Sequence, residues 1–293
     1  TVPDYPHKAS ALIVFPDVAN CCRAVPVLRQ QPVSAVELLD RRSLRSVENM
    51  KGMPAWVREL SAGACALLIE SRAASQSLLH EQIAQIMASI AGFPVEKQVD
   101  FSEDPVVYNQ LWKIRKDTFP AVGAVRRTGT TVIIEDVTFP VEQLAEGVNR
   151  LLALLDKHRY DEAIIFGHAL EGNLHFVFTQ GFDSDAEKAR YEAFMQDVAQ
   201  LVAVEFGGAL KAEHGTGRNM APFVELEWGA EAYQLMWKIK RLLDPRGILN
   251  PDVVLSEDPE IHLKNLKPLP AADEIVDKCI ECGFCEPICP SRE

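Results

Sequence analysis

The strongest constraint on the fold is an order of strand-like and helix-like segments that occurs twice. The first series is residues 11–15, 17–30, 33–39, 64–70, 75–91 and 95–99. The second series is residues 131–139, 140–158, 162–168, 174–179, 184–206 and 209–213. Both read strand, helix, strand, strand, helix, strand from their hydrophobic periodicity and turn residues. The repeat predicts an α+β fold of two ferredoxin-like βαββαβ units, about residues 1–100 and 130–214, in which helices cover an antiparallel sheet.

Other segments connect and follow the two units. Residues 104–119 have helical spacing and are stopped by Pro120, and a further helical segment is expected around residues 228–243. Residues 257–272, with three prolines and mixed charges, are expected to be a linker.

Composition limits the classes of partner. The chain has 293 residues, of which 47% are hydrophobic and 25% charged, as in soluble globular proteins. Its 42 acidic residues exceed its 30 basic residues, and this net charge of -12 argues against nucleic acid or an anionic membrane as the main partner. No apolar run approaches the roughly 20 residues of a transmembrane helix, and no export signal begins the chain. We expect a cytoplasmic protein, with peripheral attachment to the inner membrane as the alternative.

Four of the seven cysteines form one tight cluster, Cys279, Cys282, Cys285 and Cys289, followed by Pro290. This spacing is that of bacterial ferredoxins, whose thiolates hold a [4Fe-4S] cluster. A structural zinc site is the less suitable alternative. Because the missing initiator methionine and the end near Pro290 suggest a fragment, residues 273–293 are interpreted as the truncated start of a ferredoxin-type domain. Three other cysteines are expected to pack in the core; they are Cys21, Cys22 and Cys65.

Two histidines flank a Glu-Gly-Asn turn between strand-like runs. A hairpin would bring His168 and His175 together at the strand ends. In the predicted topology the strand at residues 209–213 ends at the same edge, so Glu213 should join them. Two imidazoles and a carboxylate can hold a divalent metal, and zinc, iron and manganese all fit. The alternative is that each histidine is a hydrogen-bonded residue at a strand end.

Two further residues are candidates for catalysis. Adjacent strand residues face opposite ways, so His214 should be free of the metal and could act as general base; a surface histidine is the alternative. Arg115 could bind a substrate carboxylate through its planar guanidinium, although most helical arginines are only solvated. Arg126, Arg127 and Arg218 are weaker candidates of the same kind.

These motifs resemble the FAD-linked oxidase C-terminal domain of D-lactate dehydrogenases, D-2-hydroxyglutarate dehydrogenases and glycolate oxidase subunits, in the subgroup fused to an iron-sulfur module. The matching stretches are Gly167-His168-x4-Asn173-Leu174-His175, Glu213-His214-Gly215-Thr216-Gly217, Ile239-Lys240-x3-Asp244-Pro245-x2-Ile248-Leu249-Asn250-Pro251 and Asp277-Lys278-Cys279-Ile280-Glu281-Cys282-Gly283-Phe284-Cys285-Glu286-Pro287. The resemblance implies that residues 1–256 form the substrate-binding domain of a flavoprotein.

The resemblance also implies roles. FAD would be bound mostly by a domain absent from this chain, with the Asn250 segment returning toward the flavin. His168, His175 and Glu213 would hold the metal. His214 would take the hydroxyl proton of a small 2-hydroxy acid, and Arg115 would bind its carboxylate.

Electrons would pass through the cluster to a quinone, cytochrome or other carrier. Hydroxyglutarate-type members have a lysine and a polar residue where this sequence has Ile134 and Val177, which favours D-lactate as the substrate. The isolated fragment would be inactive. A metal-dependent hydrolase and a non-catalytic electron-transfer subunit are the alternative functions.

Overall fold

The structure is a computed structural model that describes residues 4–50, 53–266, 269–273, 276–279 and 283. The strands are β1 (His7–Phe15), β2 (Ala35–Leu39), β3 (Cys65–Ala73), β4 (Lys97–Ser102), β5 (Thr130–Thr138), β6 (Ile164–His168) and β7 (Asn173–Gly181). The helices are α1 (Val18–Leu28), α2 (Arg41–Val47), α3 (Gln76–Ile90), α4 (Pro105–Val125), α5 (Leu144–Lys157), α6 (Asp185–Ala199), α7 (Gly217–Met220) and α8 (Val224–Leu243). Within the described residues the strands form one antiparallel sheet, in the order β4-β1-β3-β2-β6-β7-β5. The predicted α+β fold is confirmed.

Side-chain caps explain where several helices begin. The side chains of Asp17, Ser75 and Ser184 accept hydrogen bonds from backbone N–H groups in the first turns of α1, α3 and α6. Asp104 does the same for α4, and Pro105 follows it at the first helical position. These residue types are favoured there because they satisfy donors that the helix itself leaves unpaired.

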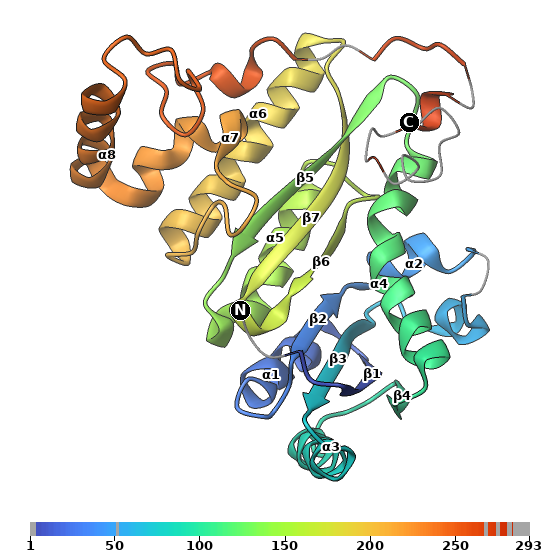
Figure 1. The fold of residues 1–293 in the computed structure, drawn as a ribbon. Helices are drawn as coiled ribbons and strands as arrows, with labels where there is room; N and C mark the ends of the chain where they lie inside the picture. Colours follow the sequence, from blue (N-terminus) through green and yellow to red (C-terminus); the bar gives the residue numbers. More distant parts are fainter. Residues whose placement is uncertain (1–3, 51–52, 267–268, 274–275, 280–282, 284–293) are drawn as a thin grey trace, which may run out of the picture.

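The two faces of the sheet carry two apolar layers. α1, α3, α5 and α6 pack on one face, over the larger cluster of buried residues. α2 and α4 pack on the other face, and Figure 1 shows α4 lying across it. Along β7, Phe176 and Phe178 belong to the first layer and Val177 to the second. Because strand side chains alternate between faces, His175 lies on the α4 face with Val177.

One predicted strand is wrong. Residues 209–213 form no strand; Ala209 makes only an isolated bridge to Thr138. The physical reason is that a side chain replaces the strand ladder, because the Asp136 carboxylate accepts hydrogen bonds from the backbone N–H groups of Glu213 and His214. With those donors satisfied, the segment can run as a loop. In the described residues, the second unit therefore has three strands and a bridge.

The two half-sheets are joined by β2 and β6, which pair antiparallel through residues 37–39 and 166–168. The junction extends beyond the strands. The backbone N–H of Asp40 donates to the carbonyl of Ile165 at 3.0 Å, and the Ser43 hydroxyl donates to the same oxygen at 2.9 Å. Asp40 also caps α2 by accepting from the Ser43 N–H. The start of α2 thus holds the second unit against the first.

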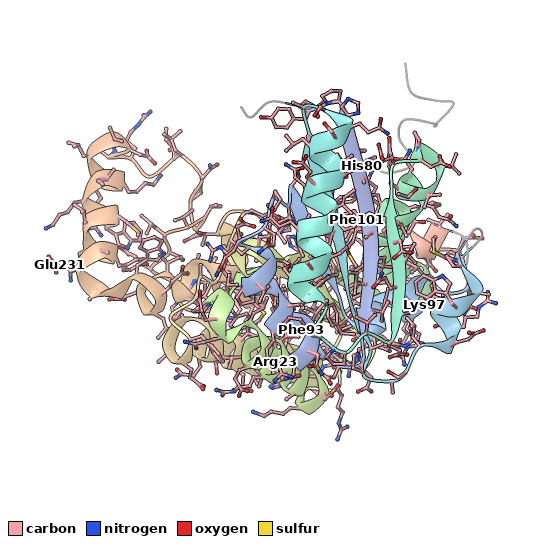
Figure 2. The ribbon with its side chains drawn as sticks, turned by 90° about the horizontal axis from the view of Figure 1, so that it is seen from below. Arg23, His80, Phe93, Lys97, Phe101 and Glu231 are labelled. Carbon is pink, nitrogen blue, oxygen red and sulfur yellow. The ribbon has the colours of Figure 1, made fainter. Side chains whose placement is uncertain are left out.

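The C-terminal helical region forms an arm beside the sheet. Figure 2 shows Glu231 of α8 on a lobe that stands away from the strands and from α3. The predicted helix at residues 228–243 is present and begins earlier, at Val224, with a kink at Gly229 where φ is 79°. No helix of the described chain is both long and apolar enough to cross a membrane.

We predict that Asp40→Asn stabilises the protein at neutral pH and not in acid. Burial raises the pKa of Asp40 to about 6, above its value of about 4 in an unfolded chain. The folded state therefore favours the protonated carboxyl, and the stability gained from that preference, present below about pH 4, is lost as the pH rises through 6.

Asparagine retains the cap without titrating. The difference in unfolding free energy between variant and wild type, measured by urea denaturation at each pH, should grow between pH 4 and 7 by up to about 3 kcal/mol. A difference that does not change with pH would contradict the prediction.

Candidate active site

The turn between β6 and β7 brings two histidines to the same face of the sheet. Phe166 pairs with His175, so His168, two residues later in β6, lies on the side of the sheet that carries His175. The two imidazole rings are perpendicular, with centroids 5.4 Å apart. The turn depends on glycine, because a Cβ on Gly167 would lie 2.3 Å from the carbonyl oxygen of Asn173. Any larger residue would force the strand ends apart.

Glu213 completes a set of three converging donors. Its Oε1 lies 3.1 Å from His168 Nε2 and 3.0 Å from His175 Nε2. One ligand atom from each residue falls within a span of 4.8 Å. Glu213 reaches this point from a loop, since the Asp136 carboxylate binds its backbone N–H at 2.6 Å. The sequence-based expectation that these three residues meet is therefore reproduced, although the strand invoked for Glu213 is absent.

Glu37 orients His168 from the neighbouring unit. Its Oε1 lies 2.6 Å from His168 Nδ1, and its Oε2 accepts from Arg115 Nε at 2.7 Å. Burial alone would raise the pKa of Glu37, but the His168 hydrogen bond and the Arg115 charge outweigh it and hold that pKa below its usual value. The hydrogen bond to Glu37 in turn raises the pKa of His168. This pairing leaves His168 Nε2 directed at Glu213.

His175 has the opposite electrostatic surroundings. Burial, followed by the charges of His214 and Arg115, lowers the pKa of His175 to about 4. Its Nδ1 is buried and has no hydrogen-bond partner among the described residues. A histidine that stays neutral at physiological pH has a free lone pair on one ring nitrogen, which is the form that binds metals. His175 therefore fits a ligand role better than a structural hydrogen-bonding role.

His214 lies beside the donor set, not on the opposite face. The expectation that it would point away from Glu213 as an adjacent strand residue is wrong, because the segment is a loop. Its ring stacks on His175 with centroids 4.8 Å apart, and its Nδ1 lies 3.4 Å from Asp136 Oδ1. Burial would raise the pKa of Asp136, but hydrogen bonds from two backbone N–H groups and the Lys211 charge lower it. Asp136 is thus a buried carboxylate that positions His214.

A cavity of about 560 Å³ is lined by the three histidines and by Glu213, while Glu37 and Asp136 lie behind them and do not line it. Arg115 enters it from α4, with its guanidinium carbon 4.2 Å above the Phe166 ring. This arginine is 16% exposed, so it is not a simply solvated side chain. Ile134 lines the cavity, and it pairs across the strands with the buried Val177. The cavity therefore combines a cationic corner, an imidazole-rich floor and an apolar wall.

Sequence reasoning missed two buried carboxylates and one ring. Glu37 lies inside an otherwise apolar strand and Asp136 follows the apolar run 132–134, and that placement could have marked them, because a charge is costly to bury. Phe166 had no distinguishing sequence signal. None of the three could be assigned to the site without knowing which strands are neighbours.

Other predicted site residues lie elsewhere. Asn250 follows α8, is exposed with φ at 42°, and does not line the cavity. Cys279 is exposed. The remaining residues of the predicted cluster motif, Cys282, Cys285 and Cys289, lie outside the described residues.

We predict that Gly167→Ala destabilises the chain by roughly 2 to 4 kcal/mol, because the new methyl group meets backbone atoms that cannot move without separating β6 from β7. The matched control is Gly92→Ala, where a Cβ would have nothing within 4 Å. Urea denaturation of both variants measures the difference. Equal stability of the two variants would contradict the proposed close approach.

Comparison with known proteins places the chain in a family. The family model described as "FAD linked oxidases, C-terminal domain" matches residues 5–254. The chain is 32% identical over 248 residues to the mitochondrial D-lactate dehydrogenase [cytochrome] of Arabidopsis thaliana, covering 84% of this chain and 42% of that protein. It is 35% identical over 139 residues to glycolate oxidase subunit GlcD of Bacillus subtilis (strain 168), covering 47% and 29%. The chain thus spans less than half the length of either relative.

The fold is also similar to that of a solved structure, 4-ethylphenol oxidase from Gulosibacter chungangensis. The TM-score is 0.62, with 15% identity over 87% of this chain and 55% of the other. At that identity the similarity extends to the fold alone. The family match covers nearly the whole sheet together with the cavity between β6, β7 and α4, and on that basis the chain belongs to the C-terminal domain family of the FAD-linked oxidases.

Proposed function

We propose that the protein containing this chain is an FAD-dependent dehydrogenase that oxidises a D-2-hydroxy acid, D-lactate in the first place, to the 2-oxo acid. The observation that carries the proposal is the single cavity in which His168, His175 and Glu213 converge beside His214 and Arg115. Relatives named as D-lactate dehydrogenase and glycolate oxidase subunit support the hydroxy acid as substrate class. FAD would be held mostly by a further domain, since the match covers only part of each relative.

The donor set fits a divalent metal. Two imidazole nitrogens and a carboxylate oxygen suit zinc, iron or manganese. The Glu37 carboxylate behind His168 agrees with this, because metal-binding histidines are commonly oriented by a second hydrogen bond. A bound metal would polarise the substrate hydroxyl and make its proton easier to remove.

His214 is proposed as the base that accepts this proton. Asp136 lies next to Nδ1, so a proton held there leaves Nε2 to face the cavity with a free lone pair. The negative charge of Asp136 would stabilise the imidazolium after proton transfer. Oxidation would also remove the C2 hydrogen with two electrons, which bound FAD would accept as hydride. The hydroxyl proton and the hydride together account for both hydrogens lost from the acid.

Arg115 and the apolar wall account for the substrate shape. The Arg115 Nε binds Glu37, and among described residues no partner of its terminal nitrogens is found, so these can pair with a carboxylate. The ring of Phe119 and the side chain of Ile134 line the same cavity. They suit a short apolar substituent such as the methyl group of lactate and disfavour a second carboxylate.

The remaining parts of the proposal concern electron output. The cysteine spacing supports a [4Fe-4S] cluster that would pass electrons singly to a quinone, cytochrome or other carrier.

The end of α8 exposes Leu242 and Leu243, and the loop beyond it exposes Ile248 and Leu249 beside Asn250. Exposed apolar side chains of this kind suit contact with the flavin-binding domain.

We predict that Glu37→Gln weakens divalent metal binding by about 10- to 100-fold, because a neutral amide orients His168 less strongly. The matched control is Glu103→Gln, which alters a carboxylate at the same 2.6 Å distance from an exposed histidine, His80 of α3. Titration calorimetry with Zn²⁺ and Mn²⁺ measures both. Similar affinities for the two variants would contradict a role of the Glu37–His168 hydrogen bond in metal binding.

We predict that His214→Ala in the full-length, flavin-loaded protein slows flavin bleaching by D-lactate by about 10²- to 10⁴-fold, the usual contribution of a general base. Metal content should not change, and His80→Ala should behave as wild type. Stopped-flow absorbance with D-lactate, L-lactate, glycolate and D-2-hydroxyglutarate measures the rates. The proposed function fails if none of these acids bleaches the flavin, and the role of His214 fails if both variants react alike.

A further inference from the structure

The segment after α8 crosses from one side of the molecule to the other. In Figure 1 its described residues up to 266 lie beside the α7 and α8 arm, and residues 276–279 lie at the C-terminal end of α4. Near its start, Arg218 of α7 donates to the carbonyls of Ile261 and Lys264 at 3.2 and 3.4 Å. Ile261 and His262 are buried there. The segment is therefore attached to α7, which follows the loop that supplies Glu213.

A second arginine, Arg126, contacts the same segment near Cys279. Arg126, directly after α4, donates through Nη2 to the carbonyl of Cys279 at 3.0 Å and also to the carbonyl of Asp277. Its Nη1 donates to the carbonyl of Thr130 at 2.6 Å, which fixes the guanidinium against the start of β5. Among the described residues, the neighbouring Arg127 has no contact with these carbonyls, and it lies 3.8 Å from Glu187 of α6. Within this part of the chain, only one of the two adjacent arginines makes the contact.

The chain around Asp277 is shaped to present these carbonyls. The Asp277 carboxylate accepts from the Ala272 N–H at 3.0 Å, and its own N–H donates to the carbonyl of Asp273 at 2.7 Å. The two contacts hold Asp277 in place, and its carbonyl is one of the two that Arg126 binds. A planar guanidinium can bind two such oxygens at once, which a lysine ammonium does less well.

Charge also favours this placement. Residues 273–289 contain five acidic residues and one lysine, whereas the loop after α4 carries Arg126 and Arg127 in succession. α4 links this loop to the cavity, since Arg115 precedes Arg126 by about three turns, or about 16 Å at the helical rise. The arginine that contacts the first cysteine of the motif thus directly follows the helix that carries Arg115 into the substrate cavity.

We propose that the C-terminal end of α4 is the docking surface for the cysteine-bearing segment, with Arg126 as its positioning residue. The docking itself does not depend on the proposed dehydrogenase activity; its consequence for electron output does. Arg126 would fix the cluster module relative to the cavity while taking no part in substrate chemistry. The guanidinium stabilises the docked segment through charge-assisted hydrogen bonds, which the undocked segment would lack.

The first test measures docking without substrate. Hydrogen–deuterium exchange of full-length Arg126→Gln should be faster in residues 269–279 by about tenfold, the effect of losing a charged hydrogen bond. Arg127→Gln is the matched control and should exchange as wild type there. A second variant, Asp277→Ala, leaves Arg126 and its contact to Thr130 intact and should also accelerate exchange. Protection equal to wild type in both Arg126→Gln and Asp277→Ala would overturn the proposal.

The second test separates docking from the proposed function. After D-lactate is added to the full-length protein, flavin bleaching should be unchanged in Arg126→Gln, while the cluster's electron paramagnetic resonance signal should appear about tenfold more slowly. Unaltered cluster reduction alongside faster exchange would mean that the surface has no role in electron output. Absence of flavin bleaching in the wild type would refute the dehydrogenase proposal and leave the exchange result to decide the docking.

Discussion

The antiparallel pairing of β2 with β6 is the constraint on which the site depends. It turns two half-sheets into one sheet and sets Glu37 directly opposite His168. The carboxylate that orients the first imidazole therefore comes from the other unit. Because a shift of one residue in strand register would turn Glu37 to the opposite face, the pairing cannot slip without removing this contact. The Asp40 and Ser43 contacts to Ile165 reinforce the same register.

Two buried carboxylates position histidines of the site. Glu37 compensates its burial by binding His168 and Arg115, and it draws positive charge toward His168. The burial of Asp136 is compensated by the two backbone hydrogen bonds that it accepts and by the nearby charge of Lys211. His175, between them, has no such compensation at Nδ1 and stays neutral. Buried charges persist only where partners satisfy them, so these contacts hold the site together as well as tuning it.

Much of the fold could be predicted because periodicity and turn residues act locally. The strand and helix order apart from residues 209–213, the core position of Cys21, Cys22 and Cys65, and the meeting of the two histidines agree with the structure. The meeting of Glu213 with them was expected for a partly wrong reason, since Asp136 and not a fourth strand brings it there. His214 was assigned to the wrong face for the same reason. A side chain that replaces a strand ladder leaves no periodic pattern to read.

By itself, the sequence determined the element order, the ligand-type residues, the glycine needed at the β6–β7 turn and the cysteine spacing, since each is a property of neighbouring residues. Only the tertiary structure decided which charges meet. Glu37 and His168 are 131 positions apart, Asp136 and Glu213 are 77 apart, and Arg126 and Cys279 are 153 apart. Such contacts depend on strand pairing and on the packing of α4 over the sheet, which local propensity does not specify.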